Sequence, residues 1–214
     1  MSPPAAQLLF ELCFVCIRPI LTNLFSVEHF CPLTIRVNRA LTALDVRGNA
    51  LGDGSTALAE AVSKHQQIVT FCEVPVKQMR DDALVELDLK QKGIGACGAM
   101  VVAHLLEFSR ALNTLNLSDN KIGAYDRDGD NTAPWIPTPG GPNALFESLK
   151  ANSTLTSLDF SKDYVDAAGA KGIAECIKVN KALNSVDLRS NQIPDEGKQQ
   201  LRDAVREKSI TLQL

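Results

Sequence analysis

The sequence has few aromatic residues, no surplus of positive charge and no apolar run long enough to cross a membrane. Its 214 residues carry 22 Lys and Arg against 25 Asp and Glu, a net charge of −3, and only 5% are aromatic. A net-acidic chain lacks the broad positive field that attracts nucleic acid or anionic lipid, so neither is predicted as a partner. Hydrophobic residues make up 45% of the chain, which excludes disorder throughout and suffices for the core of one domain, or at most two.

The six cysteines are too dispersed for a disulfide framework in a chain of this length. Cys13 and Cys16 have the spacing of a redox or zinc pair, but no second Cys pair and no His pair completes a metal site. We therefore predict buried, reduced thiols, no metal site and a cytoplasmic setting.

Residues 5–17 form an apolar stretch near the start of the sequence. The stretch has no basic segment before it, contains Glu11, and ends at Arg18 and Pro19, short of the roughly 20 residues that a membrane span requires. We predict that residues 1–34 form an apolar helical cap or a degraded repeat, rather than a membrane contact or a secretion signal.

One eleven-residue pattern then recurs, with apolar residues at its first, fourth, sixth and eleventh positions. Its five copies begin at Leu41, Leu84, Leu112, Leu155 and Leu183. Successive copies start 28 or 43 residues apart. Polar residues alternate with the fourth and sixth positions, which predicts a strand with one buried face. The segments that follow have apolar residues at steps of three and four, which predicts helices.

The pattern L-x-x-L-x-L-x-x-N-x-I, its 28-residue period and the glycines that open the helices resemble the leucine-rich-repeat family of the ribonuclease-inhibitor type. The resemblance covers residues 35–214. It implies an α/β solenoid, a short horseshoe with parallel strands on the concave face and helices on the convex face. Because no single repeat can bury its own apolar face, neighbouring repeats must stack.

The ninth position of the pattern holds a recurrent asparagine: Asn49, Asn120 and Asn191. We expect these amides to form a structural ladder of hydrogen bonds from repeat to repeat. Lys92 and Asp163 take this position in the other two copies, where we expect looser joints.

Two segments interrupt the period. Residues 68–76 begin like a repeat but are too short for a full one, which predicts a half-repeat without a helix. Residues 124–141 contain three prolines and predict an irregular insertion in the repeat domain. Trp135, the only tryptophan, lies in this insertion and is predicted either to contact a partner or to fold back over the core.

No motif in the sequence supports catalysis. Gly93, Gly95 and Gly98 match a dinucleotide-binding fingerprint, yet glycines of other repeats share two of their columns, so the repeat explains them without a cofactor. Residues 126–131 open like a calcium loop but lack the Gly and Glu that such a loop requires. We predict no catalytic residue, no cofactor and no metal.

The fifth and seventh positions of the pattern point away from the core, onto the open face of the sheet. The fifth positions are Asp45, Asp88, Asn116, Asp159 and Asp187, and the seventh are Arg47, Lys90, Ser118, Ser161 and Arg189. We expect these residues, with Trp135, to bind a protein partner by charge complementarity. The alternative is a solvated face on which neighbouring charges neutralise one another.

The function predicted from the family resemblance is non-enzymatic protein–protein recognition by a monomer through the concave face. Two alternatives remain open. One is a regulator, either inhibitor or activator, of an enzyme such as a small GTPase or a ribonuclease, as members of the family are. The other is a dinucleotide-binding enzyme that uses the glycines at 93, 95 and 98.

Overall fold

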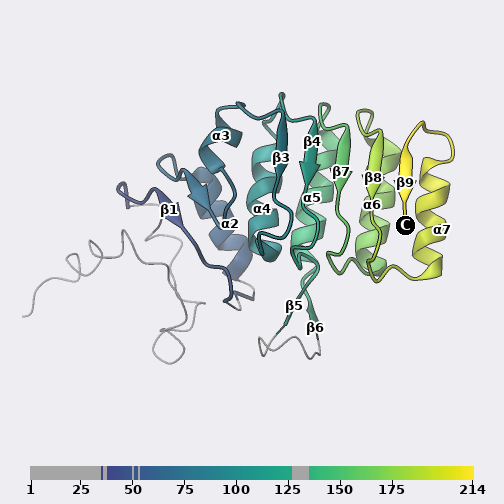
Figure 1. Cartoon of the computed structure of the whole chain (residues 1–214), viewed down its shortest axis with the longest axis horizontal. Helices are drawn as coiled ribbons and strands as arrows, with labels where there is room; N and C mark the ends of the chain where they lie inside the picture. The colour runs from purple at the N-terminus through teal and green to yellow at the C-terminus, as the bar shows by residue number, and fades with distance from the viewer. Residues whose placement is uncertain (1–34, 36–37, 50, 53, 127–134) are drawn as a thin grey trace, which may run out of the picture.

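The computed structural model describes residues 35, 38–49, 51–52, 54–126 and 135–214. Strands and helices alternate along the chain, and Figure 1 shows them in two layers, with strands in front and helices behind. The predicted cap over residues 1–34 lies outside the described residues. Within the part of the chain that is described, no helix has the length and apolar character that crossing a bilayer requires.

The main sheet has five parallel strands, which lie side by side in their chain order. They are β3 (Glu86–Asp88), β4 (Thr114–Asn116), β7 (Ser157–Asp159), β8 (Ser185–Asp187) and β9 (Thr211–Gln213). From β3 to β8, the register places the fourth position of each repeat opposite the fourth position of the next. The predicted α/β leucine-rich-repeat solenoid is confirmed.

Helices cover one face of the sheet and leave the other face open (Figure 1). They are α2 (Gly54–Lys64), α4 (Gly95–Leu106), α5 (Gly140–Ala151), α6 (Ala167–Val179) and α7 (Asp195–Val205). Buried apolar side chains recur at steps of three and four residues, as at Ile173, Ala174 and Ile177 in α6. Asp166 precedes α6, and its carboxylate accepts a 2.9 Å hydrogen bond from the amide of Gly169, which caps the first turn.

A smaller parallel sheet precedes the main one. In it, β1 (Ala43–Leu44) pairs with β2 (Thr70–Phe71), and the described structure has no strand pairing between β2 and β3. The prediction of a half-repeat without a helix is wrong, because the short helix α3 (Val76–Arg80) follows β2. Val76 and Met79 stand three residues apart on α3 and are both buried, so even one and a half turns provide an apolar face.

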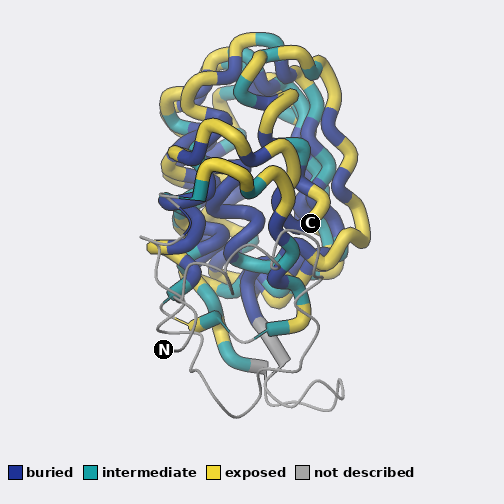
Figure 2. The backbone as a smooth tube through the Cα atoms, turned by 90° about the vertical axis from the view of Figure 1, so that its left-hand side faces the viewer, coloured by how far each residue is buried: buried dark blue, intermediate teal, exposed yellow. Residues whose placement is uncertain are grey.

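The core lies between the sheet and the helices, and Figure 2 shows buried segments inside the molecule and exposed segments along its outer turns. The fourth positions have exposed fractions of 8, 7, 0, 2 and 1% for Leu44, Leu87, Leu115, Leu158 and Val186. Complete burial of such a side chain contributes about 1.5–3 kcal/mol. The sixth positions of all five copies are also buried, so the two predicted interior columns are confirmed.

The insertion contains a two-stranded antiparallel ribbon that projects beyond the ends of the strands, below the middle of the main sheet (Figure 1). Its strands are β5 (Ala124–Asp126) and β6 (Trp135–Pro137), and helix α5 already begins at Gly140. The described part of residues 124–141 is therefore regular rather than irregular. At the base of the ribbon, the amide of Thr138 donates to the carbonyl of Gly123 at 2.8 Å, and its hydroxyl donates to Ile122 O at 2.8 Å. These bonds fix where the ribbon leaves the repeat.

Candidate protein-binding surface

The open face of the main sheet carries the predicted polar columns in the predicted register. Asp88, Asn116, Asp159 and Asp187 lie opposite one another on successive strands. The strand spacing of about 4.8 Å brings their side chains close together. The prediction omitted a further column, the third positions, which share this face: Glu86, Thr114, Ser157 and Ser185. The alternation of side chains along a strand was the signal that could have found them.

The fifth column has a structural role that the sequence did not reveal. In every repeat, the side-chain Oδ1 of position five accepts a hydrogen bond of 3.0 Å from the backbone amide of position seven. The bond satisfies an amide just beyond the end of the strand, as in an Asx turn. Asp and Asn both supply the acceptor, which explains their recurrence without any partner.

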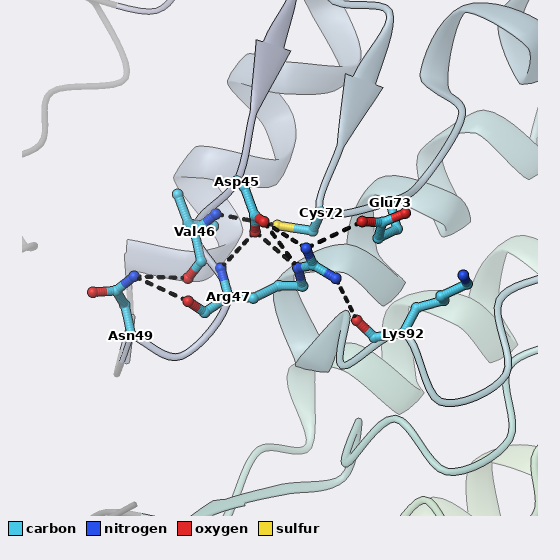
Figure 3. Close-up of polar contacts among 7 residues, drawn as sticks. All are labelled: Asp45, Val46, Arg47, Asn49, Cys72, Glu73 and Lys92. Carbon is cyan, nitrogen blue, oxygen red and sulfur yellow. Dashed lines mark hydrogen bonds and ion pairs between the residues drawn. The ribbon is translucent and has the colours of Figure 1, made fainter. Parts of the chain in front are cut away.

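Arg47 and Asp45 follow β1 of the smaller sheet, which precedes the N-terminal end of the main sheet, and Figure 3 shows their contacts. Arg47 Nε donates to the two carboxylate oxygens of Asp45 at 2.9 and 3.1 Å, and these hydrogen bonds lower the pKa of Asp45. The guanidinium also donates to Glu73 Oε1 at 3.2 Å and to the carbonyl oxygen of Lys92 at 2.9 Å. Arg47 thus joins three successive segments across the break between β2 and β3.

A second Asp–Arg pair lies on β8, next to the C-terminal edge strand β9. Arg189 Nε lies 3.0 Å from each carboxylate oxygen of Asp187, and Nη2 lies 2.5 Å from Oδ2. Burial raises the pKa of Asp187, but the hydrogen bonds from Arg189 outweigh this effect and lower it. Asp187 is itself buried, so at this end only the arginine is exposed.

The centre of the face differs from its two ends. Among the described residues, no ion pair joins Asp88 or Asp159 to a basic side chain. Asp88 and Lys90 are exposed, whereas Asp159 and Ser161 are half-buried. The prediction that Ser118 lies open on this face is wrong: it is 2% exposed, and its hydroxyl donates to Asn116 Oδ1 at 2.8 Å.

The predicted ladder is present where a preceding repeat is described. Asn120 Nδ2 donates to Leu89 O of the β3 repeat at 2.8 Å and to Leu117 O of its own repeat at 2.6 Å. Asn191 Nδ2 likewise donates to Phe160 O at 2.8 Å and to Leu188 O at 2.9 Å. By contrast, among the described residues the amide nitrogen of Asn49 bonds only to carbonyls within its own turn. The repeat that would precede Asn49 falls largely in residues the structure does not describe.

A second set of polar side chains, which the prediction missed, joins the repeats where the helices end. Asn152 Nδ2 donates to Leu106 O at 3.0 Å, and Asn180 Nδ2 donates to Leu149 O at 2.6 Å, each capping the helix of the preceding repeat. Both asparagines are buried. The sequence contains a signal for these two asparagines, because each stands three residues before the first leucine of a repeat. His65, also buried, holds the same place, and its Nε2 lies 2.7 Å from Asn38 O.

The described cysteines are structural. Cys72, Cys97 and Cys176 are free thiols, and all three are buried. Burial raises the pKa of Cys72 and of Cys176 to about 12, so both remain protonated and weakly nucleophilic. The residues that the structure describes contain no group of three or more His, Cys, Asp or Glu side chains able to hold a metal ion.

The glycines of the dinucleotide-like motif are explained by the turn between strand and helix. Gly93 and Gly95 have φ angles of +66° and +59°, a region that other residues rarely adopt. At Gly98, a Cβ would lie 2.6 Å from the Cβ of Ile94. Trp135 is described through its backbone in β6, and the position of its side chain lies outside the description.

Three segments of the chain, residues 37–55, 109–124 and 179–198, match the family model described as Leucine Rich repeat. A search of curated proteins finds no sequence match. Among solved structures, actin-binding site 2 of leiomodin-1 is similar, with a TM-score of 0.53 and 17% identity over 66% of this chain and 77% of that one. The tropomodulin C-terminal domain of Caenorhabditis elegans gives a TM-score of 0.42 and 17% identity over 85% of this chain and 92% of its own. The leiomodin likeness supports the fold.

Proposed function

Because the chain is a leucine-rich-repeat protein with an open sheet, we propose that it is a protein-interaction module that binds its partner through the concave face. One observation carries the proposal: the carboxylates at the two ends of the face are paired with arginines, whereas those at its centre are not. A face that served only to neutralise charge would pair Asp88 and Asp159 with bases as well. Among the described residues, Lys90 forms no ion pair with Asp88, and Arg189 is paired with Asp187 and acts on Asp159 only through a weaker charge interaction. A preformed sheet also loses little conformational freedom on binding.

The partner that fits this centre presents basic side chains. Asp88, Asn116 and Asp159 form one row across β3, β4 and β7, and Glu86 adds a further exposed carboxylate beside them. Lys90 is the exposed base of the same area. Complementary charge speeds association and discriminates between partners more than it adds affinity. The proposed contact residues are therefore Asp88, Lys90, Asn116, Asp159 and Ser161.

In this proposal, the Asp45–Arg47 and Asp187–Arg189 pairs chiefly stabilise the fold rather than contact the partner. Arg47 and Asp45 connect repeats, and Asp187 is buried, so their removal would disturb the fold before it disturbed binding. Arg189 remains exposed and can contribute to a contact. A partner that is an enzyme would make the protein a regulator, which is one form of the same function. We propose that the module acts as a monomer in the cytoplasm. The free, buried thiols of the three described cysteines support the cytoplasmic setting.

The test uses a double variant that removes charge without disturbing the turns. Asp88→Asn with Asp159→Asn keeps the Oδ1 acceptor for the amide of position seven, as the natural Asn116 does. The matched control, Glu107→Gln with Glu207→Gln, removes two exposed carboxylates beyond the ends of α4 and α7. Purified actin, monomeric and filamentous, is the first defined probe because of the leiomodin likeness. The proteins retained from a lysate of the source cell are the second.

We expect the double variant to weaken partner binding roughly tenfold and to flatten its dependence on salt, whereas the control binds like the wild type. Failure of actin alone would exclude actin and leave the proposal standing. If both proteins retain the same partners with the same affinity, or if the wild type retains none, the concave face is not the binding surface.

A further inference from the structure

Asp163 takes the ninth position of its repeat, where the ladder of hydrogen bonds has an asparagine in three of the five copies. Its side chain is completely buried, and its Oδ1 accepts the backbone amide of Asn120 at 2.8 Å. The amide of Ile122 also donates to this carboxyl group. The other oxygen, Oδ2, is buried without a hydrogen-bond partner, alone among the described side-chain oxygen and nitrogen atoms.

In the neighbouring ladder residues, a side-chain amide nitrogen takes the place of Asp163 Oδ2. Asn120 and Asn191 each direct Nδ2 at the sixth-position carbonyl oxygen of the preceding repeat and at that of their own. By the register of the repeat, the equivalent carbonyls for Asp163 are Leu117 O and Phe160 O. An ionised Oδ2 cannot donate to them, whereas a protonated Oδ2 can, just as the asparagine nitrogen does.

The surroundings of Asp163 favour the neutral carboxyl group. Burial, together with the nearby carboxylates of Asp119 and Asp159, raises its pKa to about 8, against the lowering effect of the two backbone amides. Asp119 lies in the turn after β4 and Asp159 at the end of β7, the two repeats between which Asp163 stands. Lys121 and Lys162, in the flanking turns, are exposed.

We propose that Asp163 carries a proton in the folded protein at neutral pH and that loss of this proton weakens the joint between the β4 and β7 repeats. The protonated carboxyl completes the ladder in place of an asparagine. The same joint supports the ribbon, because Asp163 O accepts the amide of Gly123 at 2.7 Å, directly before β5. The inference does not depend on the proposed partner, since it concerns the stability of the chain alone.

The test compares urea unfolding of the full chain and of Asp163→Asn from pH 5 to pH 9. A carboxyl whose folded pKa is raised stabilises the fold below its unfolded pKa, and this stabilisation is lost as the pH rises through the folded value. The folding equilibrium constant of Asp163→Asn, divided by that of the wild type, should therefore rise roughly tenfold per pH unit up to about pH 8 and then level off. A ratio that stays constant across this range overturns the proposal.

Two further variants separate protonation from a general loss of packing. Asp166→Asn changes a carboxyl in the same loop but outside the ladder, and should retain the pH dependence of the wild type. Asn191→Asp places a second carboxyl at a half-buried ladder position and should make the pH dependence steeper. Carbon-13 NMR of the side-chain carboxyl, assigned by its absence in Asp163→Asn, must show titration near pH 8. Titration near pH 4 would refute the assignment even if the variants proved unstable.

Discussion

Gly123→Ala tests the way in which the ribbon is attached to the repeats. Gly123 lies directly before β5, and a Cβ at this position would be 2.5 Å from Tyr164 O and 2.8 Å from Asp163 O. Both neighbours are backbone atoms, so they cannot rotate away as a flexible side chain would. The substitution must displace the turn after β7 or the base of the ribbon.

The expected cost follows from two contributions. Overpacking of a well-packed site costs about 1–3 kcal/mol. Displacement also weakens the 2.7 Å hydrogen bond from the Gly123 amide to Asp163 O, and such a bond contributes about 1 kcal/mol. We therefore expect Gly123→Ala to lower the free energy of unfolding by about 2–4 kcal/mol, a large share of the roughly 5–15 kcal/mol of a typical domain.

The matched control applies the same substitution where the structure has room. Gly172 lies within α6, and a Cβ there would come no closer than 3.7 Å to Phe146, an ordinary contact. Alanine in a helix interior is more stable than glycine by about 0.5–1 kcal/mol. Gly172→Ala should therefore stabilise the chain, so the two alanines act in opposite directions.

Urea unfolding followed by far-ultraviolet circular dichroism at pH 7 measures both effects. Equal m-values would show that only stability has changed. If Gly123→Ala changes the free energy of unfolding by less than about 0.5 kcal/mol, the size of an ordinary surface substitution, the close approach between the ribbon and the β7 repeat is not real. If Gly172→Ala instead lowers the midpoint, the room that the structure gives a Cβ at Gly172 is not real, and the control fails.

Three further outcomes are expected from the same assay. Asn120→Ala leaves two buried carbonyls without their donor and should cost about 2–4 kcal/mol, whereas Asn49→Ala, at a half-exposed side chain bonded within its own turn, should cost less than about 1 kcal/mol. Leu115→Ala, at a fully buried position in β4, should cost about 2–5 kcal/mol. The lowered pKa of Asp45 stabilises the fold above its unfolded value near 3.9, and this stabilisation is lost as the pH falls through the folded value; Arg47→Gln should therefore make the loss of stability in acid shallower.

The interior of this protein was predictable because its signal lies within single repeats. A strand alternates inward and outward side chains, so Leu87 and Leu89 identify the buried face without knowledge of any neighbour. Whether β2 pairs with β3 depends on how two separate segments lie relative to each other, and the alternation of residues within one strand does not report this. The 16 residues from Ile68 to Leu84 show that a full repeat does not fit, but not which strands remain unpaired.

The surface proposed for binding was predictable in position but not in its balance of charge. The sequence placed Asp45 and Asp88 in one column, yet only the structure shows that Arg47 holds the first and that no base holds the second. Side-chain rotamers decide this difference, and a pattern of residue types does not specify them. The helix-end asparagines were missed for another reason. They stand before the first leucine, outside the eleven residues by which the repeat was recognised.

The two departures from the ladder coincide with the two long intervals between repeats. Lys92 and Asp163 belong to the copies that begin 43 residues after their predecessors, whereas Asn120 and Asn191 follow intervals of 28 residues. A ladder asparagine bonds to the repeat before it, and each altered position follows an interval that contains an additional element. At each altered joint, another contact spans the gap: Arg47 donates to Lys92 O across the half-repeat, and the Gly123 amide donates to Asp163 O beneath the ribbon. The repeats therefore accommodate an insertion by replacing the hydrogen bonds between neighbouring repeats at that joint. The strands on each side of the joint keep their register.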